Sequence, residues 1–398
     1  MFKLKKAKKY ISEFGQLIIL IVSIPFLLIL ILPYSRLRYV VKKLFKIKPS
    51  ILWGPAPIIS NYHNSLAVKK YGYKSDTLVY QPYIITQSKI FDYNLSRFRK
   101  IPILSFTIPF LVIFWAALKY DILHFYYNGG FLLNSNLLFI KFEHILWKIL
   151  GKKVILSAYG SDVRLESITR KLGKYNAYMD MTHEDVLKEA HLTEKQIKKR
   201  IDIVIKYSSA HISMGDMIEY TPGSINNIFY WAMDTDQWKP VYETNNDKII
   251  ILHAPNHKHY KGTRFLLPII ERLKNEGYPI EFVLIQGMTN AEARQFYEKA
   301  DIIAEQFIIG WHGFFAIEAM ALGKPVLCYI RKKEYLPSWA SCPIVNTNPD
   351  NLYDNLKKLV ENQQYRQEIG RQGRRYVEKV YSLEKVGGRL DKLYKSIC

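Results

Sequence analysis

One stretch of the chain, residues 300–330, constrains the fold more than any other part of the sequence. It reads ADIIAEQFIIGWHGFFAIEAMALGKPVLCYI. Its apolar residues and glycines predict a strand, a loop, a short helix and a buried strand, in that order, at 301–304, 310–313, 314–322 and 326–330. Gly323 suits the left-handed residue that ends a helix, and Pro325 prevents the helix from continuing. Such a stretch is typical of an α/β domain with a parallel sheet.

The loop at 310–313 would bring backbone N–H groups to the start of the helix at 314–322. A helix start carries partial positive charge and unpaired N–H donors, so it can bind an anion such as a phosphate. Glu318 lies on one face of the same helix. An ordinary structural α/β unit would show the same pattern, so these residues alone leave both an anion site and a purely structural unit open.

Residues 318–326, EAMALGKPV, resemble the donor-site signature E-A-M-A-x-G-x-P-V of retaining, nucleotide-sugar-dependent glycosyltransferases of the group 1 type, which have the GT-B fold. The resemblance implies an α/β protein with two Rossmann-like domains that face a cleft. It also implies that Glu318 holds the ribose hydroxyls of the nucleotide, and that the glycine loop faces the diphosphate and the sugar. That loop consists of Gly310, Trp311, His312 and Gly313.

The chain departs from this family at one position. The family carries a second Glu, in an E-G-F-G sequence, eight positions before the first, and this chain has Gly310 there. Glu305 lies just upstream, at the predicted end of a strand, and is a candidate substitute that would bind the donor sugar. The alternative is a structural role for Glu305 at the end of that strand.

The basic composition of the chain indicates a polyanionic partner. Lys and Arg number 57 against 35 Asp and Glu, which gives a formal net charge of +22. Such an excess favours either a nucleic acid or an anionic membrane surface. Much of the charge flanks apolar runs and no nucleic-acid-binding signature is present, so we expect an anionic membrane surface and no nucleic acid. The three cysteines show no paired or metal-binding spacing, which fits a reducing, cytosolic setting.

An apolar run at 17–32 lies between two basic segments. As a helix it would be roughly 24 Å long, against a hydrocarbon core of about 30 Å, so it is marginal for spanning a membrane. Positive charge on both sides suits a re-entrant or in-plane anchor. A cleaved signal peptide is the weaker alternative, because no small-residue cleavage pattern follows. We expect residues 1–48 to attach the protein to a membrane, with the catalytic domains in the cytoplasm.

The rest of the chain divides into two α/β domains. We expect an N-terminal acceptor domain, a linker, a C-terminal nucleotide-sugar-binding domain and a last helix that crosses back to the first domain, at 49–220, 221–240, 241–380 and 381–398. The apolar run at 101–118 predicts a core helix, and a helix that dips one face into lipid is the alternative. Residues 193–200 predict a charged, solvated surface helix, and the strand pattern at 201–214 is expected to close the first domain.

A strand predicted at 152–158 ends in YGSDVR, residues 159–164. This element resembles the H-G-S-D-x-R element of the same glycosyltransferases, with Tyr159 where the family often has His. Ligands bind at the carboxyl ends of parallel strands in such sheets. Asp162 is therefore a candidate catalytic residue, and Tyr159 and Arg164 are candidates for the acceptor side. An Asp–Arg pair that only fixes the loop is the alternative.

The second domain is expected to begin with a strand at 248–252 and a cationic loop that contains Lys258 and Lys261. Lys261-Gly262 matches the K-G that follows the first strand of the family's C-terminal domain. The resemblance implies that Lys261 acts on the diphosphate, with Lys258 as the nearest second cation. Three histidines in this loop could bind a metal ion. Pro255 argues against a helix that would align them, and no nearby carboxylate would supply a further ligand.

Asp234-Thr235-Asp236 is an alternative metal site, because hard cations prefer carboxylates. The same stretch resembles the N-G-V-D-x-x-x-F-x-P linker of GT-B proteins, so we favour a linker without a metal.

Together these features predict a membrane-associated, metal-independent, hexosyltransferase-like glycosyltransferase. It would move a sugar, with retention, from a nucleoside-diphosphate sugar to an envelope glycan or a lipid-linked acceptor, and would need no cofactor. Two alternatives remain open. One is a non-catalytic GT-B module that binds a partner at the membrane. The other is a nucleotide-sugar 2-epimerase on the same fold, against which a membrane anchor argues.

Overall fold

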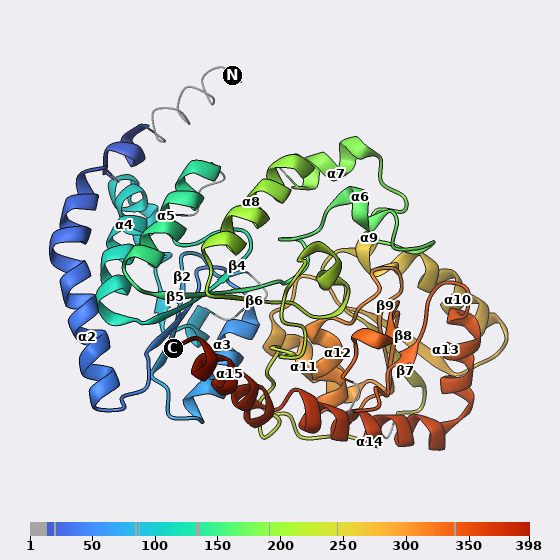
Figure 1. Ribbon diagram of the computed structural model, residues 1–398. Coiled ribbons are helices and arrows are strands. Elements are labelled where there is room, and N and C mark those ends of the chain that lie inside the picture. Colours follow the sequence, from blue (N-terminus) through green and yellow to red (C-terminus); the bar gives the residue numbers. More distant parts are fainter. Residues whose placement is uncertain are drawn as a thin grey trace.

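The structure is a computed structural model, and it describes residues 14–19, 21–83, 86, 88–132, 136–190, 192–244, 246–337 and 340–398. Its described part contains two parallel β-sheets covered by helices (Figure 1). The first sheet has the order β3-β2-β1-β4-β5-β6, with β1 (Ile51–Trp53), β2 (Ser75–Val79), β3 (Tyr93–Asn94), β4 (Ile122–Tyr126), β5 (Lys153–Ser157) and β6 (Ala210–Ile212). The second has the order β11-β10-β9-β7-β8, with β7 (Ile249–His253), β8 (Ile280–Leu284), β9 (Ile302–Gln306), β10 (Val326–Cys328) and β11 (Val345–Asn346).

Helices cover both sheets, which explains why the central strands are apolar along their whole length. Every residue of β4 and of β9 is buried. The first half contains α3 (Ile59–Lys69), α4 (Pro102–Lys119), α5 (Leu137–Ile149), α6 (Glu166–Thr169), α7 (His183–Ala190) and α8 (Glu194–Tyr207). The second half contains α9 (Lys258–Lys261), α10 (Thr263–Asn275), α11 (Asn290–Lys299), α12 (Phe314–Ala321) and α13 (Leu352–Glu361). The predicted α/β class is confirmed.

The strand predicted at 201–214 is wrong for its first half. α8 begins at a capping box of Thr193 and Gln196 and continues through Tyr207, and only Ala210–Ile212 forms a strand. Ile197, Ile201 and Val204 are buried along α8 at helical spacing. The β-branched residues in this segment therefore pack one face of a helix against the sheet, and packing overrides their strand propensity.

The N-terminal segment forms one long helix, Phe14–Leu44, of 31 residues, which includes the π-helical turn η1 (Leu27–Ile31) and α2 (Leu32–Leu44). It is longer than the apolar run suggested, because it continues through the basic residues that follow, and at about 1.5 Å per residue it spans about 46 Å. Its length and apolar composition would suit a membrane-spanning helix. Signal sequences and core helices of soluble proteins meet the same requirement.

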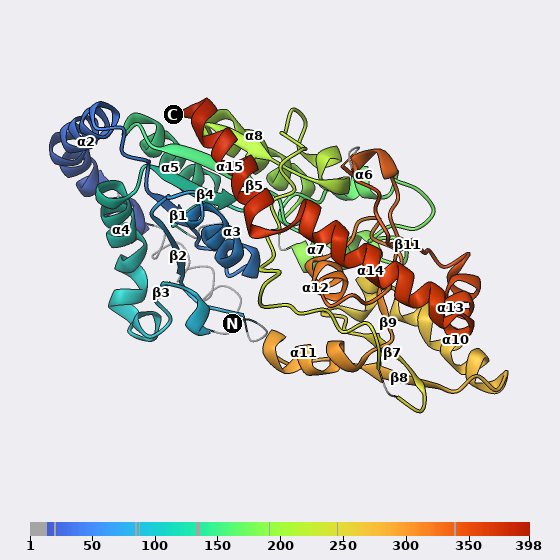
Figure 2. The same cartoon turned by 90° about the horizontal axis from the view of Figure 1, so that it is seen from below.

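The chain returns to its first half at its C-terminus. α14 (Gln363–Val380) runs along the second half, and α15 (Leu383–Ile397) crosses to lie against α3 (Figure 2). The Tyr73 hydroxyl donates to Asp391 over 2.9 Å, and His124 Nε2 and the Tyr394 hydroxyl are 2.8 Å apart. These buried contacts fasten the last helix to the first sheet.

The two halves also meet directly through a tryptophan and an ion pair. Trp311, from the loop after β9, packs its buried indole on Gly215 of the first half, where a Cβ would lie 2.2 Å from Trp311 Cδ2. Arg331, from the loop after β10, is 3.4 Å from the carboxylate of Asp216, and both side chains are buried. The contact places the carboxyl ends of β9 and β10 against the first half.

This contact predicts the effect of a methyl group at Gly215. Gly215 has a φ of +62°, so Gly215→Ala combines a strained backbone with a clash against a buried ring. We expect a loss of about 3 kcal/mol in the free energy of unfolding, measured by urea denaturation. Gly223→Ala is the control, because Gly223 has a φ of +78° and its nearest neighbour is 3.9 Å away, so it should lose only about 1 kcal/mol. Equal losses would contradict the packing described here.

Candidate functional site

The donor-side residues predicted from the sequence gather where strands of the second sheet end. The loops after β7, β9 and β10 all leave the same edge, because the strands are parallel. Each loop contacts the first half: Tyr260 bonds Glu189, Trp311 packs on Gly215, and Arg331 faces Asp216. Ligands in parallel α/β sheets bind at this carboxyl edge.

A lysine and a glutamate form the centre of this edge. Lys261 ends the short helix α9, and its ammonium makes an ion pair with Glu305, whose side chain is fully enclosed. The same ammonium donates to the side-chain oxygen of Gln306 over 2.9 Å. Cys328 Sγ lies 3.1 Å from the other carboxylate oxygen of Glu305, and the Gly313 N–H is 3.4 Å from it. Glu305 thus holds Lys261 in place and lies among groups of its own domain.

The start of α12 lies beside Lys261. Gly313 is the N-cap of α12 and supplies no side-chain hydrogen bond to it, so the first N–H groups of this eight-residue helix lack a side-chain cap. A Cβ on Gly313 would lie 3.3 Å from Lys261 Nζ, which shows how closely the ammonium approaches the helix start. The His63 ring, from α3 of the first half, stacks on Phe314 with 5.5 Å between centroids. A cation and a helix dipole therefore act on the same point.

Glu318 lies one turn further along α12 and is buried. Asn290, the first residue of α11, donates its amide to Glu318 Oε1 over 2.6 Å. Burial raises the pKa of Glu318 to about 7, although the hydrogen bond from Asn290 and the charge of Arg294 favour the ionised form. The carboxylate can accept hydrogen bonds from hydroxyl groups when it is ionised.

The remaining residues of the glycine loop are packed between the halves. Gly310 has a φ of +101°, and a Cβ there would lie 2.4 Å from the Arg331 guanidinium carbon. Trp311 is buried against Gly215. His312 is also buried, and its Nε2 is 3.0 Å from the Tyr381 hydroxyl. A side chain at Gly310 would have to adopt this positive φ and displace the Arg331 guanidinium, so a Glu at this position would require the loop to change.

The predicted cationic loop after β7 is partly helical. Lys258 is exposed at the start of α9, whereas Lys261 at its end points into the cluster with Glu305. His253 is buried and bonded on both ring nitrogens, to the carbonyl of Ala304 over 2.7 Å and to the hydroxyl of Thr263 over 2.8 Å. No group of metal-binding side chains occurs among the residues that the structure describes.

The Asp-x-Asp sequence of the linker forms a turn. Asp234 accepts hydrogen bonds from the Asp236 N–H over 3.2 Å and from the Gln237 amide over 2.7 Å. The first carboxylate is thus engaged in local bonds.

In the first half, Asp162 holds its own loop together. Its buried carboxylate accepts from the N–H groups of Tyr159, Gly160 and Tyr127 over 3.0, 2.9 and 3.2 Å. Burial raises the pKa of Asp162 to about 6, and these three hydrogen bonds oppose that rise. Its neighbour Arg164 is half-buried beside Gly160. The alternative of an Asp162–Arg164 pair that fixes the loop differs from what is observed, because backbone N–H groups donate to Asp162 instead.

Tyr159 lies next to Tyr126, which lines a cavity at the carboxyl edge of the first sheet. Its ring meets that of Tyr126 edge to face, with 5.0 Å between centroids. The cavity has a volume of about 170 Å³, and Arg99 is the one cation among the described residues that line it. The other lining residues lie at or after the ends of β1, β2 and β4: Pro55, Ala56, Pro57, Tyr80, Gln81, Tyr83, Tyr126, Asn128 and Gly130. Aromatic faces and one guanidinium suit a polar ligand that carries negative charge.

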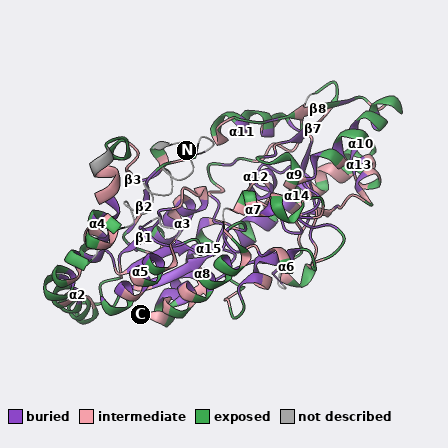
Figure 3. Ribbon diagram, turned by 90° about the horizontal axis from the view of Figure 1, so that it is seen from above, coloured by how far each residue is buried: buried purple, intermediate pink, exposed green. Residues whose placement is uncertain are grey.

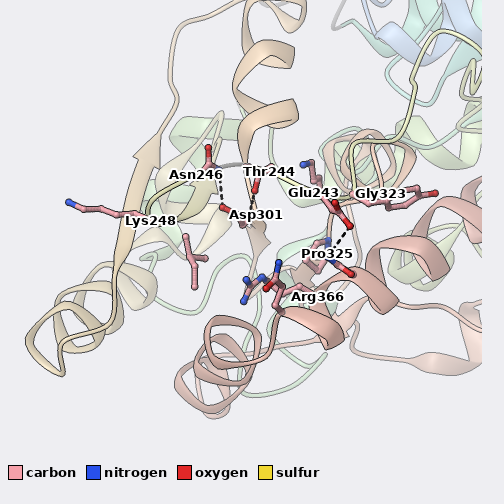
Figure 4. Close-up of a pocket in the computed structure, with 14 residues that line it drawn as sticks. Glu243, Thr244, Asn246, Lys248, Asp301, Gly323, Pro325 and Arg366 are labelled. Carbon is pink, nitrogen blue, oxygen red and sulfur yellow. Dashed lines mark hydrogen bonds between the residues drawn. The ribbon is translucent and has the colours of Figure 1, made fainter.

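A second polar pocket, of about 160 Å³, lies at the opposite, amino edge of the second sheet (Figure 4). Its Asp301 accepts from the Asn246 amide over 3.1 Å, from the Ile250 N–H over 2.8 Å and from the Thr244 hydroxyl. Arg366 donates to the carbonyl of Val360 over 2.9 Å. Asp301 and Arg366 thus already have partners, and Asp301 ties Thr244 and Asn246, which follow the linker, to the start of β7.

Sequence reasoning missed the residues that position the site. Asn290 precedes α12 by two elements, His63 comes from the first half, and Arg331 follows β10. Each reaches the site through tertiary contact, and none belongs to a local motif. One sequence feature could have indicated Asn290: it begins a helix after a capping threonine at the same carboxyl edge.

Comparison with known proteins finds similar folds at low sequence identity. No family model and no curated protein matches the sequence. Among solved structures, Anabaena HepE in complex with UDP and glucose matches with a TM-score of 0.55 and 10% identity, over 88% of this chain and 100% of HepE. Sucrose-phosphate synthase from Thermosynechococcus elongatus matches with a TM-score of 0.56 and 13% identity, over 88% of this chain and 98% of that protein. With its two parallel sheets and crossing C-terminal helix, the chain has the GT-B fold.

Proposed function

We propose that the protein is a membrane-associated glycosyltransferase that uses a nucleoside-diphosphate sugar. The observation that carries the proposal is the approach of Lys261 to the N-terminus of α12, with Glu318 one turn along that helix. A cation, a helix dipole and a carboxylate match the diphosphate and the ribose of one ligand. The similar fold of HepE, solved with UDP and glucose, supports the same ligand class.

The main chemical task would be to stabilise the departing nucleoside diphosphate. Its negative charge grows as the bond to the sugar breaks, and groups fixed in advance around that charge lower the barrier. Lys261 has three N–H donors, of which Glu305 and Gln306 take two among the described residues, so one remains for a phosphoryl oxygen. The α12 N–H groups would supply the other contacts. These groups would act without a metal ion, and transfer would retain the anomeric configuration.

Glu305 would act through Lys261 and not on the sugar. Its side chain is fully enclosed, and its oxygens face Lys261, Cys328 and the Gly313 N–H. A carboxylate in this position holds the ammonium beside the helix start. The missing Glu at Gly310 then has no direct replacement, and the sugar would be held by other groups of the two halves.

The acceptor would bind in the first half. The cavity beside Tyr126 lies at the carboxyl edge of the first sheet and contains Arg99. A glycan or lipid-linked acceptor with a phosphoryl group would match this lining. Asp162 would contribute by fixing the loop that carries Tyr159.

The proposal requires that a nucleotide sugar binds. UDP-glucose should raise the melting temperature of the full chain and should be transferred to acceptors in a membrane extract. Glu318→Ala should abolish the rise in melting temperature. Binding without transfer would indicate a non-catalytic module, and conversion of the donor sugar without an acceptor would indicate an epimerase. Absence of any nucleotide-sugar ligand would overturn the proposal.

Lys261 and Lys258 give a matched comparison on one short helix. Lys261→Ala should lower kcat/KM for the donor about 100-fold, because it removes the charge beside the departing diphosphate. Lys258→Ala should cost less than about tenfold, because the Lys258 side chain is exposed at the other end of α9. Steady-state kinetics with varied donor measures both. A larger loss at Lys258 would assign the diphosphate to that residue.

The positioning role of Glu305 is tested by a double-mutant cycle. If Glu305 acts through Lys261, Glu305→Gln should lower the transfer rate, but it should add almost nothing in the Lys261→Ala background. If Glu305 contacts the sugar by itself, the two losses should multiply.

The raised pKa of Glu318 predicts a pH dependence of donor binding. With a pKa of about 7 in the free protein, Glu318 is largely protonated at pH 6 and ionised at pH 8. If the ionised carboxylate binds the ribose, the dissociation constant for UDP should rise as the pH falls, by up to about tenfold per pH unit below pH 7. Calorimetric titrations of wild type and Glu318→Gln should differ in this respect, since the variant has no such carboxyl group. A parallel pH dependence in both proteins would contradict the assignment.

A further inference from the structure

The N-terminal helix and its neighbours leave a large apolar surface at one end of the first half, shown as exposed on α2 in Figure 3. We define this surface by six exposed leucines, namely Leu30, Leu37 and Leu44 on the helix, Leu111 and Leu118 on α4, and Leu138 on α5. The members on each of the first two helices are seven residues apart and so lie on one face. Exposed apolar patches of this kind mark contact sites for lipid or protein.

Another face of the helix is fixed to the domain. Leu27, Ile31 and Ser35 are buried, and they follow one another at helical spacing. Further along the same face, Arg38 donates to the carbonyl of Leu118 over 2.8 Å and lies 3.2 Å from Asp121.

This fixed face extends along α4 from one end to the other. Lys42 also pairs with Asp121, over 2.5 Å. At the other end, a Cβ on Gly15 would lie 2.9 Å from the Phe106 ring of α4. The helix is therefore docked near its start, in its middle and near its end. Arg38 and Lys42 bond a carbonyl at the end of α4 and the carboxylate of Asp121, just before β4. If the helix moved away, these carbonyl and carboxylate groups would lose their partners.

We propose that this helix does not span the bilayer but lies in the membrane plane, and that its outer face enters the bilayer together with the outer face of α4. A helix that crossed the bilayer would have to leave α4, expose Leu27 and Ile31 and break the contacts of Arg38 and Lys42 with Asp121. In the plane, the docked face stays intact and the apolar face enters the acyl boundary.

The charges around this surface select an anionic bilayer as the partner. Residues 14–75 contain no Asp or Glu. Arg36, Lys43 and Lys46 are exposed next to the apolar face and carry no carboxylate partner among the described residues. Basic residues near an anionic surface are attracted to it, so the rim and the apolar face reinforce each other. A second copy of this chain would place the same positive rims against each other.

This orientation would bring the acceptor cavity to the lipid surface. Arg99, which lines the cavity, belongs to the short turn Phe98–Lys100 that leads directly into α4. Phe98 and Ile101 flank Arg99 and are about half exposed. The inference rests on the membrane association in the proposed function, but it does not depend on the transfer reaction itself.

The test uses the full chain with an N-terminal epitope tag and sealed vesicles of phosphatidylcholine with or without phosphatidylglycerol. Leu111→Glu places a charge on α4 and outside the N-terminal helix, so it should lower binding to the anionic vesicles about tenfold. Leu267→Glu is the matched control, because Leu267 is an exposed leucine on α10 of the second half, and it should bind as wild type does. Vesicles without phosphatidylglycerol should bind the wild type more weakly.

Protease added outside the vesicles should remove the tag, since an in-plane helix leaves its N-terminus on the side of the domains. Protection of the tag, or unchanged binding of Leu111→Glu, would overturn the proposal in favour of a spanning helix. A dimer that forms without lipid and that Leu111→Glu disrupts would assign the surface to a second copy instead. UDP binding by both variants in detergent shows that they are folded. It also separates failure of the membrane arrangement from failure of the donor site.

Discussion

An ion pair between Lys261 and the buried carboxylate of Glu305 is the interaction on which the rest of the site depends. Glu305 is the last residue but one of the central strand β9, and Lys261 ends the helix that follows the neighbouring strand β7, so the pair ties the ends of these two segments together. Because Glu305 also lies next to the Gly313 N–H, the pair fixes the ammonium relative to the start of α12. A buried carboxylate that is fully partnered is a stable feature, whereas either charge alone would be costly to bury. The geometry therefore gives a cation that is ready for an anionic ligand before the ligand arrives.

The strand, helix and strand of residues 300–330 could be predicted from the sequence, because their periodicity and their glycine and proline signals are local. The same reasoning failed at 201–207, where Ile201 and Val204 favour a strand by type but pack as one face of a helix. The candidate site was predictable only where a motif carried it, as for Glu318. Asn290, His63 and Arg331 reach the site across the fold, and no local pattern indicates such contacts. The loop at Gly310 could be seen to depart from the family, but the reason, the guanidinium of Arg331 against it, requires the structure.

The proposed membrane-binding surface and the proposed acceptor cavity both belong to the first half. Arg38 and Lys42 hold the N-terminal helix to Asp121, just after α4, and Arg38 also bonds Leu118 of α4; α4 in turn follows the turn that carries Arg99. The last helix, α15, fastens the second half to this same unit through Asp391 and Tyr394. An acceptor held at the lipid surface and a donor held beside Lys261 would thus approach each other from the two halves.

The central claim is that the nucleotide binds at the carboxyl edge of the second sheet. Hydrogen–deuterium exchange of the full chain, with and without UDP, tests it most directly. With UDP bound, we expect slower exchange at residues 261–263 and 313–318, and no change at residues 363–367 on the amino edge of the same sheet. Protection confined to 363–367, or none at the start of α12, would contradict it.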